Sequence, residues 1–147
     1  MKRMINEMKL RVPALSVNEG VCRGALAAFL SDRDPTVEEL FDLRLALSEA
    51  VTNCIVHAYP DKKEGEVGYI YISMRLYDTG EVSLLVSDSG CGIEDTKRAM
   101  EPAFTTGDKD ARSGMGFLVM QSFTDKLTVK SKPGRGTAVL MRKFLKP

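Results

Sequence analysis

The sequence of 147 residues contains no tryptophan, one histidine and three cysteines. The cysteines are odd in number and widely spaced, without a CxxC pair, so we expect reduced thiols rather than a zinc site or disulfides. No apolar run approaches the length of a membrane span, and the N-terminus lacks the apolar segment of a signal peptide. Neither sign of charge dominates, since the chain has 21 Lys and Arg residues and 20 Asp and Glu residues. We therefore expect a cytoplasmic protein with no membrane segment and no nucleic-acid binding through bulk charge.

Hydrophobic residues make up 44% of the chain, enough for a proper core, and the length predicts a single domain over residues 1–147. Alternating apolar positions predict strands over 8–12, 69–76, 81–87, 126–131 and 137–144. Helical spacing predicts helices over 19–31, from 36 to about 58, and over 114–123, with a short helix over 94–100 and a loop over 102–113. This order favours an α/β (α+β) two-layer sandwich: a mixed, mainly antiparallel sheet with helices on one face.

The stretch SEAVTNCIVHAY, residues 48–59, places polar residues within an otherwise apolar predicted helix. Glu49, Asn53 and His57 are spaced i, i+4 and i+8, so they share one helical face. Polar groups on so apolar a helix are costly unless they face a site, and we interpret that site as one for a metal-nucleotide. The alternatives are that Glu49 is only a buried, paired carboxylate and that His57 is a structural residue near the helix end.

Three further segments have the chemistry to complete such a site. The first is the segment DSGCG, which follows a predicted strand. Its aspartate, Asp88, can accept a hydrogen bond from an exocyclic amine, which would select adenine over guanine. The glycines of the segment permit close approach of a ligand. The second, SGMG at 113–116, opens a helix whose free N–H groups suit a phosphate. The third, GRGT at 134–137, enters the last strand. Each has an ordinary alternative, which is an exposed turn, a capped helix start and a hairpin turn respectively.

In combination the segments form an ordered, widely spaced set from Leu45 to Thr137 that resembles the N, G1 and G2 boxes of the gyrase, Hsp90, histidine kinase and MutL superfamily. The phrases SEAVTNCIVHAY, VSDSGCGIED, EPAFTT and RSGMGFLVMQSFTDKLTVKS resemble the anti-sigma-F factors of endospore-forming bacteria, a family of serine kinases. Similarity extends over nearly the whole chain. The resemblance implies a Bergerat-type ATP-binding fold with ATP or ADP and Mg²⁺ as cofactors.

The resemblance also implies roles for individual residues. Glu49 matches the general base and Asn53 the protein ligand of Mg²⁺, a cation that needs few protein ligands because it keeps several waters. Asp88 matches the adenine-reading carboxylate, with Thr137 supporting the same contact. Gly90 and Gly92 match the glycines that shape the pocket.

The same resemblance assigns an ATP lid and a phosphate-binding turn. Arg112 is the only cation beside the glycines of that turn, so it is the candidate for stabilising charge on the transferred phosphoryl group. The remaining matches in this region are Thr105, Thr106, Ser113, Gly114, Met115 and Gly116.

The single histidine and the length discriminate between relatives. Sensor histidine kinases need a phosphorylated histidine on a separate helical hairpin, and gyrase-like or MutL-like enzymes carry a second domain. A stand-alone kinase that acts on another protein fits better: it would phosphorylate a serine of an anti-anti-sigma partner and, as a homodimer, sequester a sigma-F-like sporulation factor. The alternatives are a related stress-response anti-sigma kinase and a nucleotide-dependent sigma-binding module with vestigial catalysis. Arg23 is a candidate partner contact, or an ordinary solvated arginine.

Overall fold

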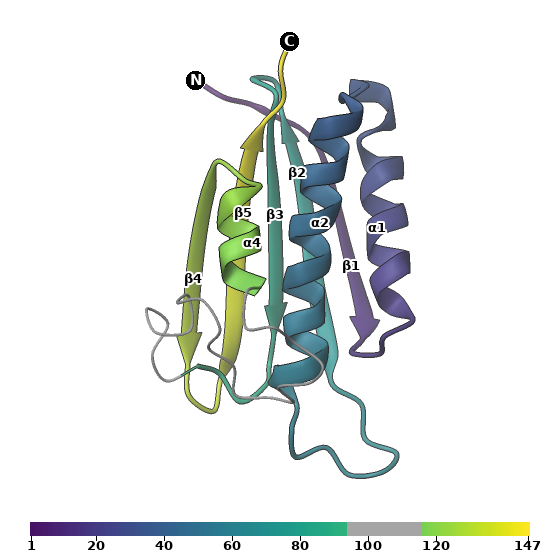
Figure 1. The fold of residues 1–147 in the computed structure, drawn as a ribbon, viewed down its shortest axis with the longest axis vertical. Coiled ribbons are helices and arrows are strands. Elements are labelled where there is room, and N and C mark those ends of the chain that lie inside the picture. The colour runs from purple at the N-terminus through teal and green to yellow at the C-terminus, as the bar shows by residue number, and fades with distance from the viewer. Residues whose placement is uncertain (94–115) are drawn as a thin grey trace.

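A five-stranded sheet forms one layer of the protein in the computed structural model, which describes residues 1–93 and 116–147. The strand order is β1-β2-β3-β5-β4, and each of these neighbouring pairs is antiparallel (Figure 1). The strands are β1 (Met4–Pro13), β2 (Tyr69–Tyr77), β3 (Glu81–Asp88), β4 (Lys126–Lys132) and β5 (Gly136–Phe144). All five strands expected from alternation are therefore confirmed.

Helices cover one face of this sheet (Figure 1). The central helix α2 (Val37–Asn53) lies between α1 (Asn18–Phe29) and α4 (Gly116–Ser122), and a short 3₁₀ turn, η1 (Ser31–Arg33), joins α1 to α2. The prediction of a two-layer α+β arrangement with a mainly antiparallel sheet is confirmed. The helix expected over 94–100 and the loop over 102–113 lie outside the described residues.

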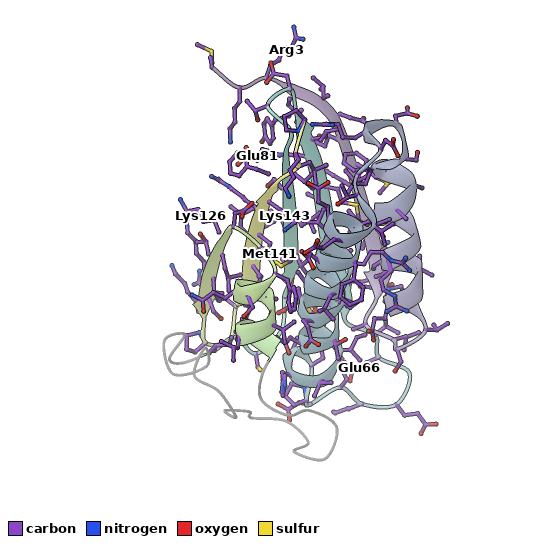
Figure 2. The ribbon with its side chains drawn as sticks, turned by 45° about the horizontal axis from the view of Figure 1, so that its top comes forward. Arg3, Glu66, Glu81, Lys126, Met141 and Lys143 are labelled. Atoms are coloured by element: carbon purple, nitrogen blue, oxygen red, sulfur yellow. The ribbon has the colours of Figure 1, made fainter. Side chains whose placement is uncertain are left out.

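The core lies between the two layers because apolar side chains alternate along each strand. Met74 of β2, Leu84 of β3 and Met141 of β5 are register neighbours and fully buried under the helices. Two residues further along β5, Lys143 faces the same layer and pairs with Asp42 of α2 at 3.4 Å (Figure 2). Burial of this apolar face provides most of the stabilisation that holds α2 against the sheet.

A capping box begins α2, as the sequence predicts. Thr36 Oγ1 accepts the backbone N–H of Glu39 at 3.0 Å, and Glu39 Oε1 accepts the N–H of Thr36 at 2.9 Å. The other carboxylate oxygen of Glu39 accepts the backbone N–H of Lys146 at 2.7 Å. Glu39 therefore fixes both the helix start and the C-terminal segment after β5.

The end of α2 differs from the regular helix that the sequence predicts. The α-helical pattern stops at Asn53, and a π-helical turn, η2 (Cys54–Ala58), completes the helical segment before Tyr59 and Pro60. The predicted end near Ala58 is confirmed, but the wider turn shifts His57 from the position that a 3.6-residue period gives it. Among the described helices, none has the length and apolar character needed to cross a membrane.

Candidate functional site

The predicted site segments that the structure describes meet at one end of the molecule. The C-terminal end of α2, the end of β3, the start of α4 and the start of β5 all lie there (Figure 1). Asp88 is the last residue of β3 and pairs in register with Thr137 of β5. Sheet pairing thus brings together two predicted site residues that are 49 positions apart in the chain.

Asp88 has a carboxylate that protein donors hold on both oxygens. Oδ1 accepts the backbone N–H of Gly90 at 2.9 Å and that of Thr137 at 3.3 Å. Oδ2 accepts the thiol of Cys54 at 3.4 Å, so the carboxylate also contacts the helical segment that carries Asn53. Hydrogen bonds from three separate segments make Asp88 a fixed acceptor rather than a mobile surface carboxylate.

Cys54 is buried at the first position of the π-helical turn. Burial raises the pKa of the Cys54 thiol, and the neighbouring Asp88 carboxylate raises this pKa further. The thiol therefore stays protonated at neutral pH and remains a donor toward Asp88.

The glycines after Asp88 are required by close packing of the backbone. A Cβ on Gly90 would collide with the carbonyl oxygen of Ala58, which accepts the N–H of Cys91 at 2.7 Å. Gly92 has a φ of +76°, and a Cβ there would collide with the carbonyl oxygen of Lys132. The DSGCG turn consequently packs between η2 and the β4–β5 hairpin, although its residues Ser89 and Cys91 are exposed.

Ser131 on β4 joins the turn to Thr137. Its Oγ accepts the N–H of Ile93 at 2.7 Å and lies 2.9 Å from the carbonyl oxygen of Gly136, to which it donates. The Oγ1 of Thr137 is 2.8 Å from the same hydroxyl. Thr137 is therefore held through its backbone by Asp88 and through its side chain by Ser131.

Tyr59 supports the other side of the turn. Its hydroxyl accepts the N–H of Ser89 at 3.0 Å and donates to the carbonyl oxygen of Tyr69 at 2.6 Å. Burial raises the pKa of Tyr59, so the phenol keeps the proton that it donates. Gly68 leaves room for this ring, because a Cβ there would collide with it.

Glu49 and Asn53 lie one turn apart on α2, and both are half-buried. The expected shared face is confirmed for this pair because both precede the π-helical turn. His57 lies within that turn, and its carbonyl oxygen accepts the thiol of Cys91 at 3.3 Å. Within the described ranges, no group of three or more His, Cys, Asp or Glu could hold a metal ion.

Several predicted site residues lie outside the described part of the chain. Gly116 is described, and it is buried at the first position of α4. The residues outside are Thr105, Thr106, Arg112, Ser113, Gly114 and Met115.

Three residues of the hydrogen-bond network were not selected from the sequence. They are Cys54, Tyr59 and Ser131. No local motif marks them, because each acts through contacts with segments distant in the chain. The one available signal is the position of Cys54 immediately after Asn53.

Arg23 of α1 contacts α2 close to Glu49. Its guanidinium donates to Glu19 at 3.1 Å and to the hydroxyl of Ser48 at 3.3 Å. The arginine side chain is 36% exposed, so it is neither buried nor fully solvated.

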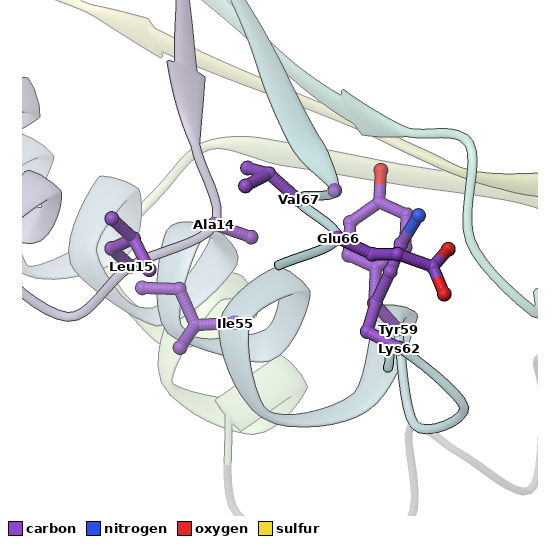
Figure 3. Close-up of a pocket in the computed structure, with 8 residues that line it drawn as sticks. Ala14, Leu15, Ile55, Tyr59, Lys62, Glu66 and Val67 are labelled. Atoms are coloured by element: carbon purple, nitrogen blue, oxygen red, sulfur yellow. The ribbon is translucent and has the colours of Figure 1, made fainter. Parts of the chain in front are cut away.

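A small pocket of about 130 Å³ lies beside Tyr59 (Figure 3). It shares Tyr59 with the network described above but includes neither Asn53 nor Asp88. Its lining residues are Ala14, Leu15, Ile55, Tyr59, Lys62, Glu66, Val67 and Gly68.

Residues 12–143 match the family model of the histidine kinase-like ATPase domain. Similar proteins include the anti-sigma F factor of Caldanaerobacter subterraneus, which is 47% identical over 95% of this chain and 94% of the relative. The anti-sigma F factor of Clostridium novyi is 44% identical over 96% of each chain. That of Priestia megaterium is 41% identical over 97% of this chain and 95% of the relative.

Solved structures share the fold at low sequence identity. The RsbU and RsbW domains of a Mycobacterium tuberculosis protein align with a TM-score of 0.70 and 17% identity, covering 97% of this chain and 34% of that one. The SiaB-SiaC complex from Pseudomonas aeruginosa aligns with a TM-score of 0.62 and 16% identity, covering 96% of this chain and 90% of that one. Identities this low support the fold alone.

Proposed function

Since this chain belongs to the histidine kinase-like ATPase family, and within it to the anti-sigma F factors, we propose that it is an ATP-dependent protein serine kinase that also sequesters a sigma factor. Its substrate is a serine of an anti-anti-sigma partner, and the sigma factor is of the sporulation, sigma-F type. The chain acts as a single cytoplasmic kinase domain that forms a homodimer. The sequence similarity to anti-sigma F factors over nearly the full chain supports this assignment.

The fixed carboxylate of Asp88 is the observation that carries the nucleotide part of the proposal. An ionised carboxylate only accepts hydrogen bonds, so it fits the exocyclic amine of adenine and disfavours the carbonyl oxygen at the same position of guanine. Gly90 and Gly92 shape the turn around it, and Thr137 lies beside it. ATP and ADP are therefore the expected ligands.

The phosphate end of the site is assigned to the polar face of α2 and to the segment before α4. Asn53 supplies a carboxamide oxygen for Mg²⁺, which bound to the nucleotide would neutralise phosphate charge. Glu49, one turn earlier, is the general base toward the attacking serine hydroxyl. Thr105, Thr106 and the residues 113–116 form the lid and phosphate turn, and Arg112 stabilises the transferred phosphoryl group.

Phosphotransfer in a defined mixture tests the proposal. The full chain is incubated with Mg²⁺, ATP labelled at the γ-phosphate and a small anti-anti-sigma domain, and the partner is examined by mass spectrometry. One phosphoserine on the partner is expected, and Glu49→Ala should form it far more slowly. An unmodified partner, with Glu49→Ala behaving as wild type, would refute the kinase assignment.

The phosphotransfer assay together with a sigma-factor pull-down separates two alternatives. Nucleotide-dependent sigma binding without any phosphorylated product would indicate a binding module with vestigial catalysis. Phosphorylation together with capture of a stress-response sigma factor would indicate the related stress-response kinase. A pull-down that identifies the bound sigma factor distinguishes these outcomes, and Arg23→Ala tests whether this half-exposed arginine contributes to the partner surface.

A further inference from the structure

The two carboxylate oxygens of Asp88 have different surroundings. Oδ1 accepts two backbone N–H groups, those of Gly90 and Thr137. Among the described residues, Oδ2 accepts one donor, the thiol of Cys54 at 3.4 Å. Because a carboxylate offers about four lone-pair sites in all, Oδ2 keeps room for one further donor.

The donors come from opposite sides of the carboxylate. The two N–H groups belong to the turn after β3 and to β5, while the thiol belongs to η2, directly after Asn53. Because the carboxylate is planar and rigid, the two hydrogen bonds to Oδ1 already restrict rotation about the bond between Cβ and Cγ. The contact with Cys54 adds a third restraint, on Oδ2 itself, from the helical segment that carries Asn53.

We propose that Cys54 is a positioning residue for base recognition, whose thiol orients Asp88 so that the remaining site on Oδ2 accepts one N–H of an exocyclic amine. This inference rests on the proposed function, in which Asp88 reads the base of a bound adenine nucleotide. It extends that function because the selectivity for an amino-purine then depends on a side chain that does not itself contact the base.

The test compares two nucleotides that differ only in the amine. Equilibrium dissociation constants of the full chain are measured for ATP and for purine riboside triphosphate, which lacks the 6-amino group, with Mg²⁺ present. We expect Cys54→Ala to reduce the preference for ATP over purine riboside triphosphate by about five- to tenfold, mainly by lowering the affinity for ATP. Cys54→Ser keeps a donor of similar size and should restore most of the preference.

Cys22 provides a matched control. It is a fully buried thiol on α1, and its removal perturbs the core without touching Asp88 hydrogen bonds. Cys22→Ala should therefore leave the preference for ATP unchanged even where it lowers stability. Where Cys54→Ala fails to fold, Cys54→Val replaces it, because valine fills the space and removes the donor.

The outcomes separate this inference from the proposed function. Equal weakening of both nucleotides by Cys54→Ala, or an unchanged preference, would overturn the positioning role while leaving adenine binding intact. A wild-type protein that binds neither nucleotide, or binds both equally, would instead overturn base reading by Asp88 and this inference with it. In an Asp88→Asn background, the effect of Cys54→Ala on the preference should disappear, since the thiol acts through that carboxylate.

Discussion

Glu49 and Asn53 occupy the same face of α2 but are assigned different roles. Asn53→Ala should remove the Mg²⁺-dependent part of nucleotide binding, because the carboxamide is the assigned protein ligand of the cation. Glu49→Ala should bind nucleotide normally and lower phosphotransfer by about 10²- to 10⁴-fold, the usual contribution of a general base. Calorimetric titration with ATP, with and without Mg²⁺, and a single-turnover transfer assay measure the two effects. Normal binding and transfer by both variants would show that this face of α2 serves only the core.

Ser131 connects three groups around the DSGCG turn through one hydroxyl. Ser131→Ala would leave the N–H of Ile93 and the hydroxyl of Thr137 without this partner, at a cost of about 1 to 3 kcal/mol in the free energy of unfolding. ATP affinity should fall as well, because Thr137 and Asp88 are held together. Denaturant unfolding and nucleotide titration measure both quantities. The control is Ser122→Ala, which removes an exposed hydroxyl that bonds within α4, and an equal effect of the two changes would contradict the expectation.

The sequence predicts Asp88 as a site residue from a short motif with recognisable chemistry, and Thr137 only through the family resemblance; the structure pairs the two in register. Cys54, Tyr59 and Ser131 could not be predicted, since their importance comes from distances across the sheet and to the helix end. A cysteine in an apolar helix has the same appearance in sequence whether its thiol meets a methyl group or a carboxylate. Cys54 and Tyr59 reach the site through contacts between the end of α2 and the end of β3, and Ser131 through pairing of β4 with β5.

The capping box of α2 makes the stability of this element depend on pH. Burial would raise the pKa of Glu39, but hydrogen bonds from the backbone of Lys146 and from Thr36 outweigh it, and the net pKa is lowered from its ordinary value of 4.5. A carboxylate whose pKa is lower in the folded state stabilises that state at pH values above its pKa in the unfolded chain. This contribution is lost as the pH falls through the pKa of the folded state. Glu39→Gln should therefore lower the free energy of unfolding by about 1 to 2 kcal/mol at neutral pH. This difference from the wild type should shrink progressively below about pH 4.5.

Thermal or urea unfolding of both proteins between neutral and acidic pH measures this difference. Glu38→Gln is the matched control, because it neutralises an exposed carboxylate in the same helical turn. If the free energies of unfolding of the wild type and Glu39→Gln differ by the same amount at every pH, the proposed origin of the stabilisation is wrong.

The start of α2 could be predicted from the sequence and the form of its end could not. Thr36 and Glu39 are three residues apart, and a capping box depends only on such local spacing. The π-helical turn at Cys54–Ala58 has no comparable local signal. Its carbonyl at Ala58 accepts the N–H of Cys91, so the wider turn is matched to a segment 33 residues later.

The sheet order explains why distant motifs can form one site. With β3 central and β5 beside it, the end of β3 and the start of β5 meet beneath the C-terminal end of α2 (Figure 1). Alternating apolar residues predicted the strands and their common buried face, but not the order β1-β2-β3-β5-β4, because alternation does not specify which strands are neighbours.

Binding at this junction should stabilise the whole molecule, because it joins α2, β3 and β5. A ligand specific for the folded state at one hundred times its dissociation constant adds about 2.7 kcal/mol. For a chain of this length that corresponds to a rise in the unfolding midpoint of about 5 to 10 °C. ATP with Mg²⁺ should produce this rise in a thermal unfolding scan, whereas GTP should produce little, because its 6-oxo group would place an acceptor against the Asp88 carboxylate. Asp88→Asn should reduce the shift with ATP while leaving the folded state measurable. An equal shift with ATP and GTP would show that the nucleotide binds without base reading at Asp88.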